Sequence, residues 1–360
     1  MPLPQTAPVR IGLIGAGFIA HYHLEGLRCA GGAEVRMVAG RTPEKTDALA
    51  QRYGIASTTT DWRALLARDD IDAVVITSPD ETHTEIAIAA TQAGKHILLQ
   101  KPMARTAQEC RRIIEAAQAA QVHLQVSFMH RYFEEVVQAR QWLAEGAIGK
   151  PYTMRIRNAT PGPDWGNWFY SQTQVGGGVV MQLGIHGIDL LRHLFGEINS
   201  VSSSTALMRS ERKLSDGTLV HPDNEDHALA IYHLASGALA THEMSMSEVQ
   251  GCDRFTLEIY GEHGTIWLRS GRGPLAIYAP RYTGDNNWQM PTLPVRPLGL
   301  RQHALFLDIV RGRVEPEATA QDGLASVLVA ESVYRASASR REEAVLHSFK
   351  KTQGDIHDST

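Results

Sequence analysis

Short apolar runs alternate with amphipathic segments through the first third of the chain. Short, largely apolar segments of this kind predict strands that are buried on both faces, as in a parallel sheet. These runs fall at residues 9–14, 34–39, 73–77, 95–99 and 124–128. The segments between them have helical spacing and helix-boundary residues, such as Pro43 directly after Thr42 and Gly54 at the end of the same segment. Strands and helices in alternation predict a doubly wound parallel sheet of the α/β class.

The pattern changes after residue 130. A helical segment, an irregular aromatic stretch and a longer helical segment come first, at residues 134–145, 158–175 and 179–195. Alternating apolar and polar positions then predict long strands. They fall at residues 198–208, 228–234, 238–246, 254–260 and 265–269. Such a run of strands predicts an α+β domain built on one large, mostly antiparallel sheet.

The length of 360 residues agrees with two domains, because a single hydrophobic core stops growing at roughly 250–300 residues. We expect the first domain over residues 1–128, the second over 129–345 and a polar tail over 346–360. The long strands leave one sheet face with too few helices to cover it. We therefore expect a homodimer or homotetramer that associates through this sheet.

Composition narrows the functional classes. The formal net charge is −4 and the chain has no basic tract, so nucleic-acid binding is not expected. The three cysteines are isolated, which argues against a disulfide framework and a cysteine zinc site. The first ten residues lack the apolar core of a signal peptide, and no apolar run is long enough to cross a bilayer. We therefore expect a cytoplasmic protein without a membrane partner.

The most informative motif is the glycine turn after the first apolar run. Its sequence, Gly15-x-Gly17-x-x-Ala20, fits a dinucleotide-binding fingerprint. Gly15 permits a tight turn, and Gly17 lacks a Cβ, so a pyrophosphate can approach the backbone. Phe18 and Ile19 open the following helix, whose free N–H groups face the phosphates. The turn follows a predicted strand and precedes a predicted helix, which is the context that the fingerprint requires.

The end of the second predicted strand indicates which dinucleotide is preferred. An NAD-selective site expects Asp or Glu there, to bind the ribose 2′-hydroxyl. The chain instead has Gly40, followed by Arg41 and Thr42. A guanidinium pairs bidentately with a 2′-phosphate, and a threonine hydroxyl can add a hydrogen bond. We therefore expect NADP to be preferred over NAD; stacking of Arg41 on the adenine is the alternative.

Two short segments hold candidate binding residues. Lys101, between Gln100 and Pro102, lies at the carboxyl end of a predicted parallel strand, where ligands of open α/β sheets bind. It either faces the cofactor crevice or is a solvated surface lysine. The aromatic loop at residues 164–170 includes Trp168. Its rings suit either the C–H faces of a sugar or packing between domains.

The long helical segment carries a polar stripe among apolar residues. Gln182, His186, Asp189 and His193 are spaced four, three and four residues apart, which places them on one helical face. A polar stripe on a buried helix needs partners or a chemical role. The structural alternatives are that Asp189 and His193 pair with each other and that His186 is a satisfied core histidine. We expect no metal, because the stripe offers no evident fourth ligand.

These motifs resemble those of the Gfo/Idh/MocA family of oxidoreductases, and the likeness covers nearly the whole chain. The matching segments are residues 11–20, Thr77-Ser78-Pro79 with His83, residues 93–102, and residues 176–178 through His186 and Asp189. The resemblance implies a Rossmann domain and NAD(P)-dependent hydride transfer on a sugar, polyol or related carbonyl. It matches Lys101 to the lysine of a Glu-Lys-Pro motif and His186 to a histidine of the second domain.

The same resemblance supplies further site residues. Arg131 lies in a segment that resembles one lining the crevice between the domains, and Trp168 resembles a tryptophan that precedes the triple glycine. We expect His186 to be the main acid/base and Lys101 to orient and polarise the substrate oxygen. The expected substrate contacts are Arg131, Trp168, Gln182 and His186. The expected cofactor contacts are Gly15, Gly17, Phe18, Ile19, Arg41, Thr42, Thr77, Ser78, Pro79, His83, Gln100 and Lys101.

Two positions depart from the family pattern. Gln100 stands where the family usually has Glu, and Gln182 where it usually has Asp. Each change removes a carboxylate, which favours a less cationic lysine or an acidic substrate; neutral drift within the pocket is the plain alternative. Two other functions stay open, a glycosidase that uses bound NAD for transient oxidation and a nucleotide-binding regulatory protein without turnover. The presence of both Lys101 and His186 opposes the regulatory protein.

Overall fold

The structure, a computed structural model, describes residues 7–249, 253–270 and 275–346. Its N-terminal part is built on a six-stranded parallel sheet in the order β3-β2-β1-β4-β5-β6. The strands are β1 (Val9–Ile14), β2 (Ala33–Ala39), β3 (Ser57–Thr59), β4 (Ala73–Ile76), β5 (His96–Leu99) and β6 (Leu124–Val126). The strand order reverses beside β1, which is where dinucleotides bind in doubly wound sheets. The predicted parallel sheet is confirmed.

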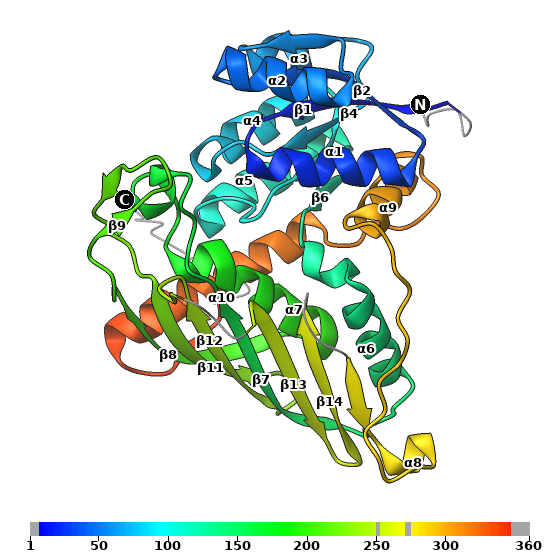
Figure 1. Cartoon of the computed structure of the whole chain (residues 1–360), viewed down its shortest axis with the longest axis vertical. Helices are drawn as coiled ribbons and strands as arrows, with labels where there is room; N and C mark the ends of the chain where they lie inside the picture. Colours follow the sequence, from blue (N-terminus) through cyan, green and yellow to red (C-terminus); the bar gives the residue numbers. More distant parts are fainter. Residues whose placement is uncertain (1–6, 250–252, 271–274, 347–360) are drawn as a thin grey trace, which may run out of the picture.

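Helices pack on both faces of this sheet (Figure 1). They are α1 (Phe18–Ala30), α2 (Pro43–Tyr53), α3 (Trp62–Leu66), α4 (Asp80–Gln92) and α5 (Ala107–Ala120). Thr42 precedes α2, as the boundary signal predicted, but its side chain makes no capping hydrogen bond. The short edge strand β3 was not predicted, because its polar residues form no apolar run. α4 begins directly after Pro79, which places Asp80 in its first turn.

The second sheet has eight strands in the order β15-β14-β13-β7-β12-β11-β8-β16. The strands are β7 (Pro151–Ala159), β8 (Ile198–Ala206), β11 (His227–Leu234), β12 (Leu239–Ser245), β13 (Phe255–Gly261), β14 (Gly264–Ser270), β15 (Ala276–Tyr278) and β16 (Glu343–Ala344). Neighbours are antiparallel except for β12 and β7, which run parallel. The predicted mostly antiparallel sheet is confirmed. A separate hairpin pairs β9 (Arg212–Lys213) with β10 (Leu219–Val220).

Helices cover one face of this large sheet (Figure 1). They are α6 (Glu134–Ala144), α7 (Ile185–Phe195) and α10 (Ala320–Ser339), while the short α8 (Pro280–Thr283) lies beyond β15. Along β11, Ala228, Ala230 and Tyr232 are buried against the helices, and Leu229 and Ile231 between them are exposed. This alternation is the period-two pattern from which the strand was predicted.

One C-terminal helix returns to the first domain. α9 (Leu300–Val310) packs against α1. Its Phe306, Leu307 and Val310 share a core with residues of β1 and β2. The division expected from the sequence assigns this helix to the second domain, but in space it belongs with the parallel sheet. In the described parts of the chain, no helix is both long enough and apolar enough to cross a membrane.

The approach to α7 is not a regular helix. Residues Val180–Gly184 form a π-helical turn before α7 begins at Ile185. A π turn widens the helix locally and is frequent at functional sites. The long helix expected over residues 179–195 therefore begins with a π turn and becomes an α-helix only at Ile185. The turn contains Gln182 and directly precedes His186.

Candidate active site

The glycine turn between β1 and α1 has the geometry that a dinucleotide requires. Gly15 has a φ of +113°, and a Cβ there would lie 2.6 Å from the backbone carbon of Thr77. At Gly17 a Cβ would meet no atom within 4 Å, so the space beside this backbone is open. No side chain caps α1, and its first N–H groups are therefore available to a phosphate. These residues fit the pyrophosphate of a bound dinucleotide.

The loops after β4 and β5 are tied to this turn and to each other. Thr77 donates from Oγ1 to the carbonyl of Gly15 at 2.9 Å. Nδ1 of His83 lies 2.9 Å from the carbonyl oxygen of Pro102, and its Nε2 lies 2.9 Å from the carbonyl oxygen of Ser78. His83 thus holds the Ser78-Pro79 loop against the Lys101-Pro102 loop. It positions the cofactor loops, and both of its ring nitrogens are engaged in doing so.

Gln100 belongs to a buried hydrogen-bond chain. Its Nε2 donates to Nε2 of His23 at 2.9 Å, Nδ1 of His23 lies 2.9 Å from Nε2 of His303, and Nδ1 of His303 lies 2.7 Å from the carbonyl of Gly299. The carbonyl can only accept, so Nδ1 of His303 donates, and each ring in turn offers its Nε2 as an acceptor. The last acceptor, on His23, needs an N–H donor. An amide supplies that donor, which a carboxylate does not, and this explains glutamine at residue 100.

Lys101 joins the two domains at the carboxyl end of β5. Its Nζ donates to the backbone carbonyl of Gln182 at 2.7 Å. Burial lowers the pKa of Lys101 to about 8, with the carboxylate of Asp80 opposing this effect and Arg254 adding to it. The side chain is therefore not a solvated surface lysine. Its amine is poised to exchange a proton near neutral pH.

Gln182 also makes a second contact across the domains. Its Nε2 donates to Oδ2 of Asp80 at 2.5 Å. Both side chains are buried, and burial raises the pKa of Asp80. A carboxylate at residue 182 would instead face this buried carboxylate directly. Glutamine fits at residue 182 because its amide can donate a hydrogen bond to the neighbouring carboxylate of Asp80.

Two stacked histidines lie beside this pair. The rings of His130 and His186 are 4.4 Å apart at 12°, and both side chains are at least nine-tenths buried. Nδ1 of each ring is buried without a hydrogen-bond partner. Burial lowers the pKa of His130 to about 3, and burial together with His130, Lys101 and Arg254 lowers the pKa of His186 well below its usual value. His186 is therefore a neutral imidazole, and Lys101 is the group that titrates near neutrality.

Arg131 does not face the substrate region as expected. It donates from Nε and Nη2 to the two carboxylate oxygens of Asp189, at 2.8 and 2.5 Å, and its Nη2 lies 3.4 Å from Asp322. Arg131 and Asp189 are both buried. The pairing of Asp189 with His193, the structural alternative at the sequence level, is also not what the structure shows. The guanidinium of Arg131 instead clamps α7 to the loop after β6, and we withdraw it as a substrate contact.

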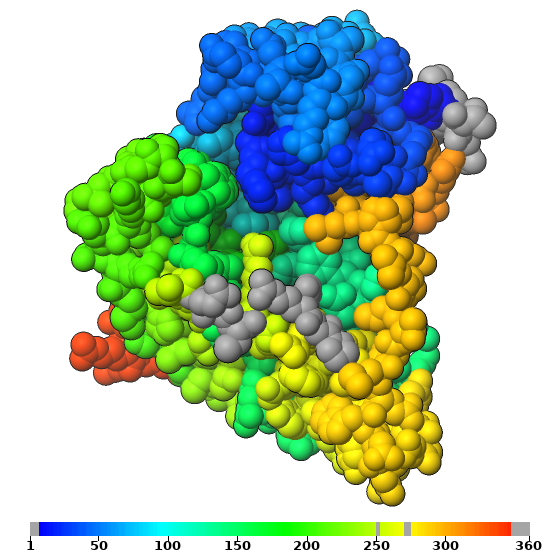
Figure 2. All heavy atoms as spheres, viewed as in Figure 1, coloured from blue at the N-terminus to red at the C-terminus, as the bar shows by residue number. Residues whose placement is uncertain are grey.

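The aromatic loop reaches the cofactor turn. Trp165 stacks on Phe18 with ring centroids 5.9 Å apart, and Trp168 stacks on Phe169 at 3.9 Å. Phe18 is 70% exposed, at the start of α1. The surface is hollowed between the blue N-terminal domain and the green and yellow sheet domain (Figure 2). The loop therefore meets the cofactor turn through Trp165. Trp168 lies behind it, against the rings of Trp165 and Phe169.

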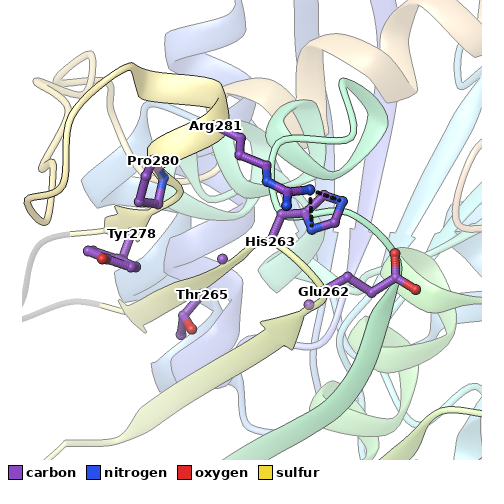
Figure 3. Close-up of a pocket in the computed structure, with 8 residues that line it drawn as sticks. Glu262, His263, Thr265, Tyr278, Pro280 and Arg281 are labelled. Atoms are coloured by element: carbon purple, nitrogen blue, oxygen red, sulfur yellow. Dashed lines mark hydrogen bonds between the residues drawn. The ribbon is translucent and has the colours of Figure 1, made fainter.

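Other depressions of the surface hold none of the predicted site residues. Figure 3 shows one of about 370 Å³ between the β13–β14 hairpin and α8, where Arg281 contacts the ring of His263. Another, of about 430 Å³, lies between α3, α4 and α5. In the described parts of the chain, no three His, Cys, Asp or Glu residues gather as metal ligands.

Comparison with known proteins identifies the family. A sequence model of an oxidoreductase family with an NAD-binding Rossmann fold matches residues 9–128, and one of the GFO/IDH/MocA C-terminal domain matches residues 136–267. Levoglucosan dehydrogenase of Pseudarthrobacter phenanthrenivorans is 30% identical over 286 residues, which cover 72% of this chain and 73% of that protein. The chain belongs to the Gfo/Idh/MocA family. It is accordingly an oxidoreductase with an NAD-binding domain, as the resemblance implied.

Another relative and two solved structures align over more of the chain. 1,5-Anhydro-D-fructose reductase of Ensifer adhaerens is 29% identical over 341 residues, 91% of this chain and 96% of that protein. The solved structure of levoglucosan dehydrogenase in complex with NADH and levoglucosan has a TM-score of 0.83 at 26% identity, covering 94% of this chain and 99% of that one. GenD2 from gentamicin A biosynthesis, in complex with NAD, has a TM-score of 0.80 at 26% identity, covering 96% and 98%.

Three residues of this Gfo/Idh/MocA site were not predicted from the sequence. Asp80 directly follows the Thr77-Ser78-Pro79 motif, and a carboxylate at that place was the one signal in the sequence that could have indicated it. His130 directly precedes Arg131 in the segment expected to line the crevice. Only its stacking on His186 shows that it, rather than its neighbours, belongs to the site. Arg254 precedes β13, far from every motif, and no local pattern indicates that it lies near Lys101.

Proposed function

We propose that this chain transfers a hydride between a nicotinamide cofactor and a secondary alcohol of a sugar, a polyol or the corresponding carbonyl compound. The observation that carries the proposal is the contact of Lys101 with the backbone of Gln182. It brings a titrating amine at the end of β5 to the helix that carries His186. Relatives of the chain include a levoglucosan dehydrogenase and a 1,5-anhydro-D-fructose reductase.

The chain's own residues then handle the proton. The glycine turn would hold the pyrophosphate of a dinucleotide, whose nicotinamide would supply the hydride acceptor or donor. Lys101, as a neutral amine, takes the proton of the alcohol, and the carbonyl of Gln182 holds the resulting ammonium. His186 stays neutral and accepts a hydrogen bond from a substrate hydroxyl. This division differs from the expectation that His186 is the main acid/base, because burial and three nearby basic groups disfavour its protonation.

A substrate panel tests the proposal. The purified chain is incubated with NAD⁺ or NADP⁺ and a set of sugars, polyols and their glycosides, while reduced nicotinamide and released sugar are both measured. Net formation of reduced nicotinamide with one of these alcohols supports the proposal. Glycoside cleavage without net reduction would identify the glycosidase instead, and cofactor binding with neither reaction would identify a regulatory protein.

We propose that the chain prefers NADP to NAD, because Arg41 and Thr42 stand where an NAD-selective site has an acidic residue. Arg41 and Thr42 are exposed and directly follow Gly40, just after the end of β2. The guanidinium of Arg41 makes no hydrogen bond or ion pair with the described residues, so it is available to a 2′-phosphate. A Cβ at Gly40 would lie 2.3 Å from Oγ1 of Thr46, so the acidic side chain of an NAD-selective site does not fit there without a shift.

We also propose that two or four copies associate through the large sheet. Leu229 is 52% exposed and Ile231 is 45% exposed on β11, and Leu239 on neighbouring β12 is 42% exposed. These side chains lie on the face opposite to α7 and α10. Contiguous exposed apolar side chains are typical of an interface. Light scattering at micromolar concentration tests this, and a monomeric mass would contradict it.

A further inference from the structure

Arg254 lies at the mouth of the candidate active site. It directly precedes β13, and the N–H of Ala159 at the end of β7 donates to its carbonyl at 2.9 Å. The next residue, Phe255, places its ring 5.1 Å from the ring of His130, which stacks on His186. β13 begins at the end of the sheet nearest the N-terminal domain (Figure 1). Arg254 therefore lies close to the histidine pair, and its charge acts on Lys101 as well as on both histidines.

The guanidinium of Arg254 has no partner among the described residues. Buried or half-buried arginines nearby are paired: Arg131 with Asp189, Arg157 with Glu243 and Arg212 with Asp226. Arg254 is exposed. An arginine left without a carboxylate, at the edge of a site, is available to an anion from solution.

The rest of the site also carries an excess of basic groups. Lys101 and the two histidines face the same region as Arg254, and both histidines have an unpartnered, buried Nδ1. Asp80 is the nearby carboxylate, and the amide of Gln182 already binds one of its oxygens. With Asp80 ionised, Lys101 and Arg254 leave a net charge of about one positive unit when both are protonated. One singly charged anion therefore balances the site.

We propose that the substrate carries a carboxylate and that Arg254 binds it, so that the chain acts on a sugar acid, an aldonic or uronic acid, rather than on a neutral sugar. This inference rests on the proposed function. A guanidinium fork binds a planar carboxylate through two parallel hydrogen bonds. A phosphate ester would bring about two negative charges, which exceed what Lys101 and Arg254 balance beside Asp80.

The arrangement has a chemical consequence. A carboxylate on Arg254 screens its positive charge from Lys101 and His186. Arg254 lowers the pKa of both groups, so the bound substrate raises those pKa values and strengthens Lys101 as a base. The pH midpoint of oxidation should therefore lie higher with the acid than with a neutral alcohol.

The test compares matched substrates and variants. Wild type, Arg254→Gln and Arg112→Gln are assayed with a sugar or polyol and with the acid in which one terminal CH₂OH is replaced by a carboxylate. Arg112 is an exposed arginine on α5, away from the site, and is the matched control. We expect wild type to prefer the acid. We expect Arg254→Gln to lower kcat/KM for the acid by about 100-fold, mainly through KM, as for the loss of one charge-assisted bidentate pair. Arg112→Gln should change kcat/KM by less than about threefold with either substrate. With the neutral alcohol, Arg254→Gln should lose far less than with the acid, and only as much as the higher pKa of Lys101 accounts for.

A binding measurement separates the possible failures. Titration calorimetry with a sugar acid should show binding to wild type that Arg254→Gln loses, while the Kd of NADP⁺ stays unchanged. If neutral alcohols are oxidised and Arg254→Gln treats both substrates as wild type does, the inference is overturned and the proposed function stands. If Arg254→Gln weakens cofactor binding instead, Arg254 binds the dinucleotide and the inference is wrong. If no alcohol, acidic or neutral, is oxidised, the proposed function itself fails.

Discussion

The side-chain amide of Gln182 donates a 2.5 Å hydrogen bond to the buried carboxylate of Asp80, across the boundary between the two domains. The same residue accepts a hydrogen bond from Lys101 through its backbone carbonyl. Gln182 therefore holds an acid with its side chain and a base with its main chain. The charge of Asp80 also opposes the effect of burial, so that the pKa of Lys101 falls less far than burial alone would take it.

An exchange of the two side chains tests this relationship. Gln182→Glu places two carboxylates against each other and should lower the free energy of unfolding by about 1–3 kcal/mol, because a buried acceptor loses its donor. The double variant Asp80→Asn with Gln182→Glu restores one amide and one carboxylate, and should recover most of this loss. Urea unfolding at neutral pH measures both. Equal stability of the single and double variants would show that the pair does not interact.

Gln100→Glu should disturb the chain of His23, His303 and Gly299. The introduced carboxylate faces the lone pair of His23 Nε2, so we expect a loss of about 1–3 kcal/mol in the free energy of unfolding near pH 8. Gln51→Glu, on the exposed face of α2, is the matched control. Burial raises the pKa of the introduced carboxyl in the folded state, and its protonated form can donate to His23. Its stability deficit should therefore shrink as the pH is lowered, and a deficit that grows would contradict the assigned ring tautomers.

Arg41→Ala should change the choice of cofactor. Loss of the guanidinium should raise the Kd of NADP⁺ by about 10- to 100-fold, the range for a charge-assisted hydrogen bond, and leave the Kd of NAD⁺ within about threefold. Fluorescence titration of each cofactor measures this. If wild type binds NAD⁺ as tightly as NADP⁺, or if Arg41→Ala weakens both equally, Arg41 does not bind a 2′-phosphate.

The pH dependence of oxidation should report Lys101. Alcohol oxidation needs the neutral amine, so kcat/KM with a neutral substrate should rise with pH and reach half of its maximum near the Lys101 pKa of about 8. Carbonyl reduction needs the ammonium and should fall over the same range. Arg254→Gln removes a positive charge that lowers this pKa, and the midpoint should move to higher pH. A flat profile, or a midpoint that moves down, would show that another group titrates.

The sequence predicted the parts of the fold that depend on neighbouring residues. Local patterns predicted each of these parts. Apolar runs predicted β1 and β4, the glycine spacing predicted the turn at Gly15 and Gly17, and alternating apolar and polar residues predicted β11. The position of Lys101 followed from the rule that ligands bind beyond the carboxyl ends of parallel strands.

The rest of the site depends on contacts between residues far apart in the chain. Asp80 and Gln182 are separated by 102 positions, and Arg131 and Asp189 by 58. The low pKa of His186 arises from its burial and from His130, Lys101 and Arg254, which come from three other segments. The π-helical turn before α7 likewise leaves no mark in the spacing of polar residues.

The turnover of Lys101→Met tests the central claim most directly. The claim is that Lys101, held by the backbone of Gln182, exchanges the proton while hydride moves to or from the nicotinamide. With an alcohol that wild type oxidises, kcat of Lys101→Met should fall by about 100-fold or more, while the Kd of NADP⁺ stays the same because the glycine turn is untouched. His186→Ala should also lower kcat and keep the Kd. A Lys101→Met enzyme with wild-type kcat would contradict the account.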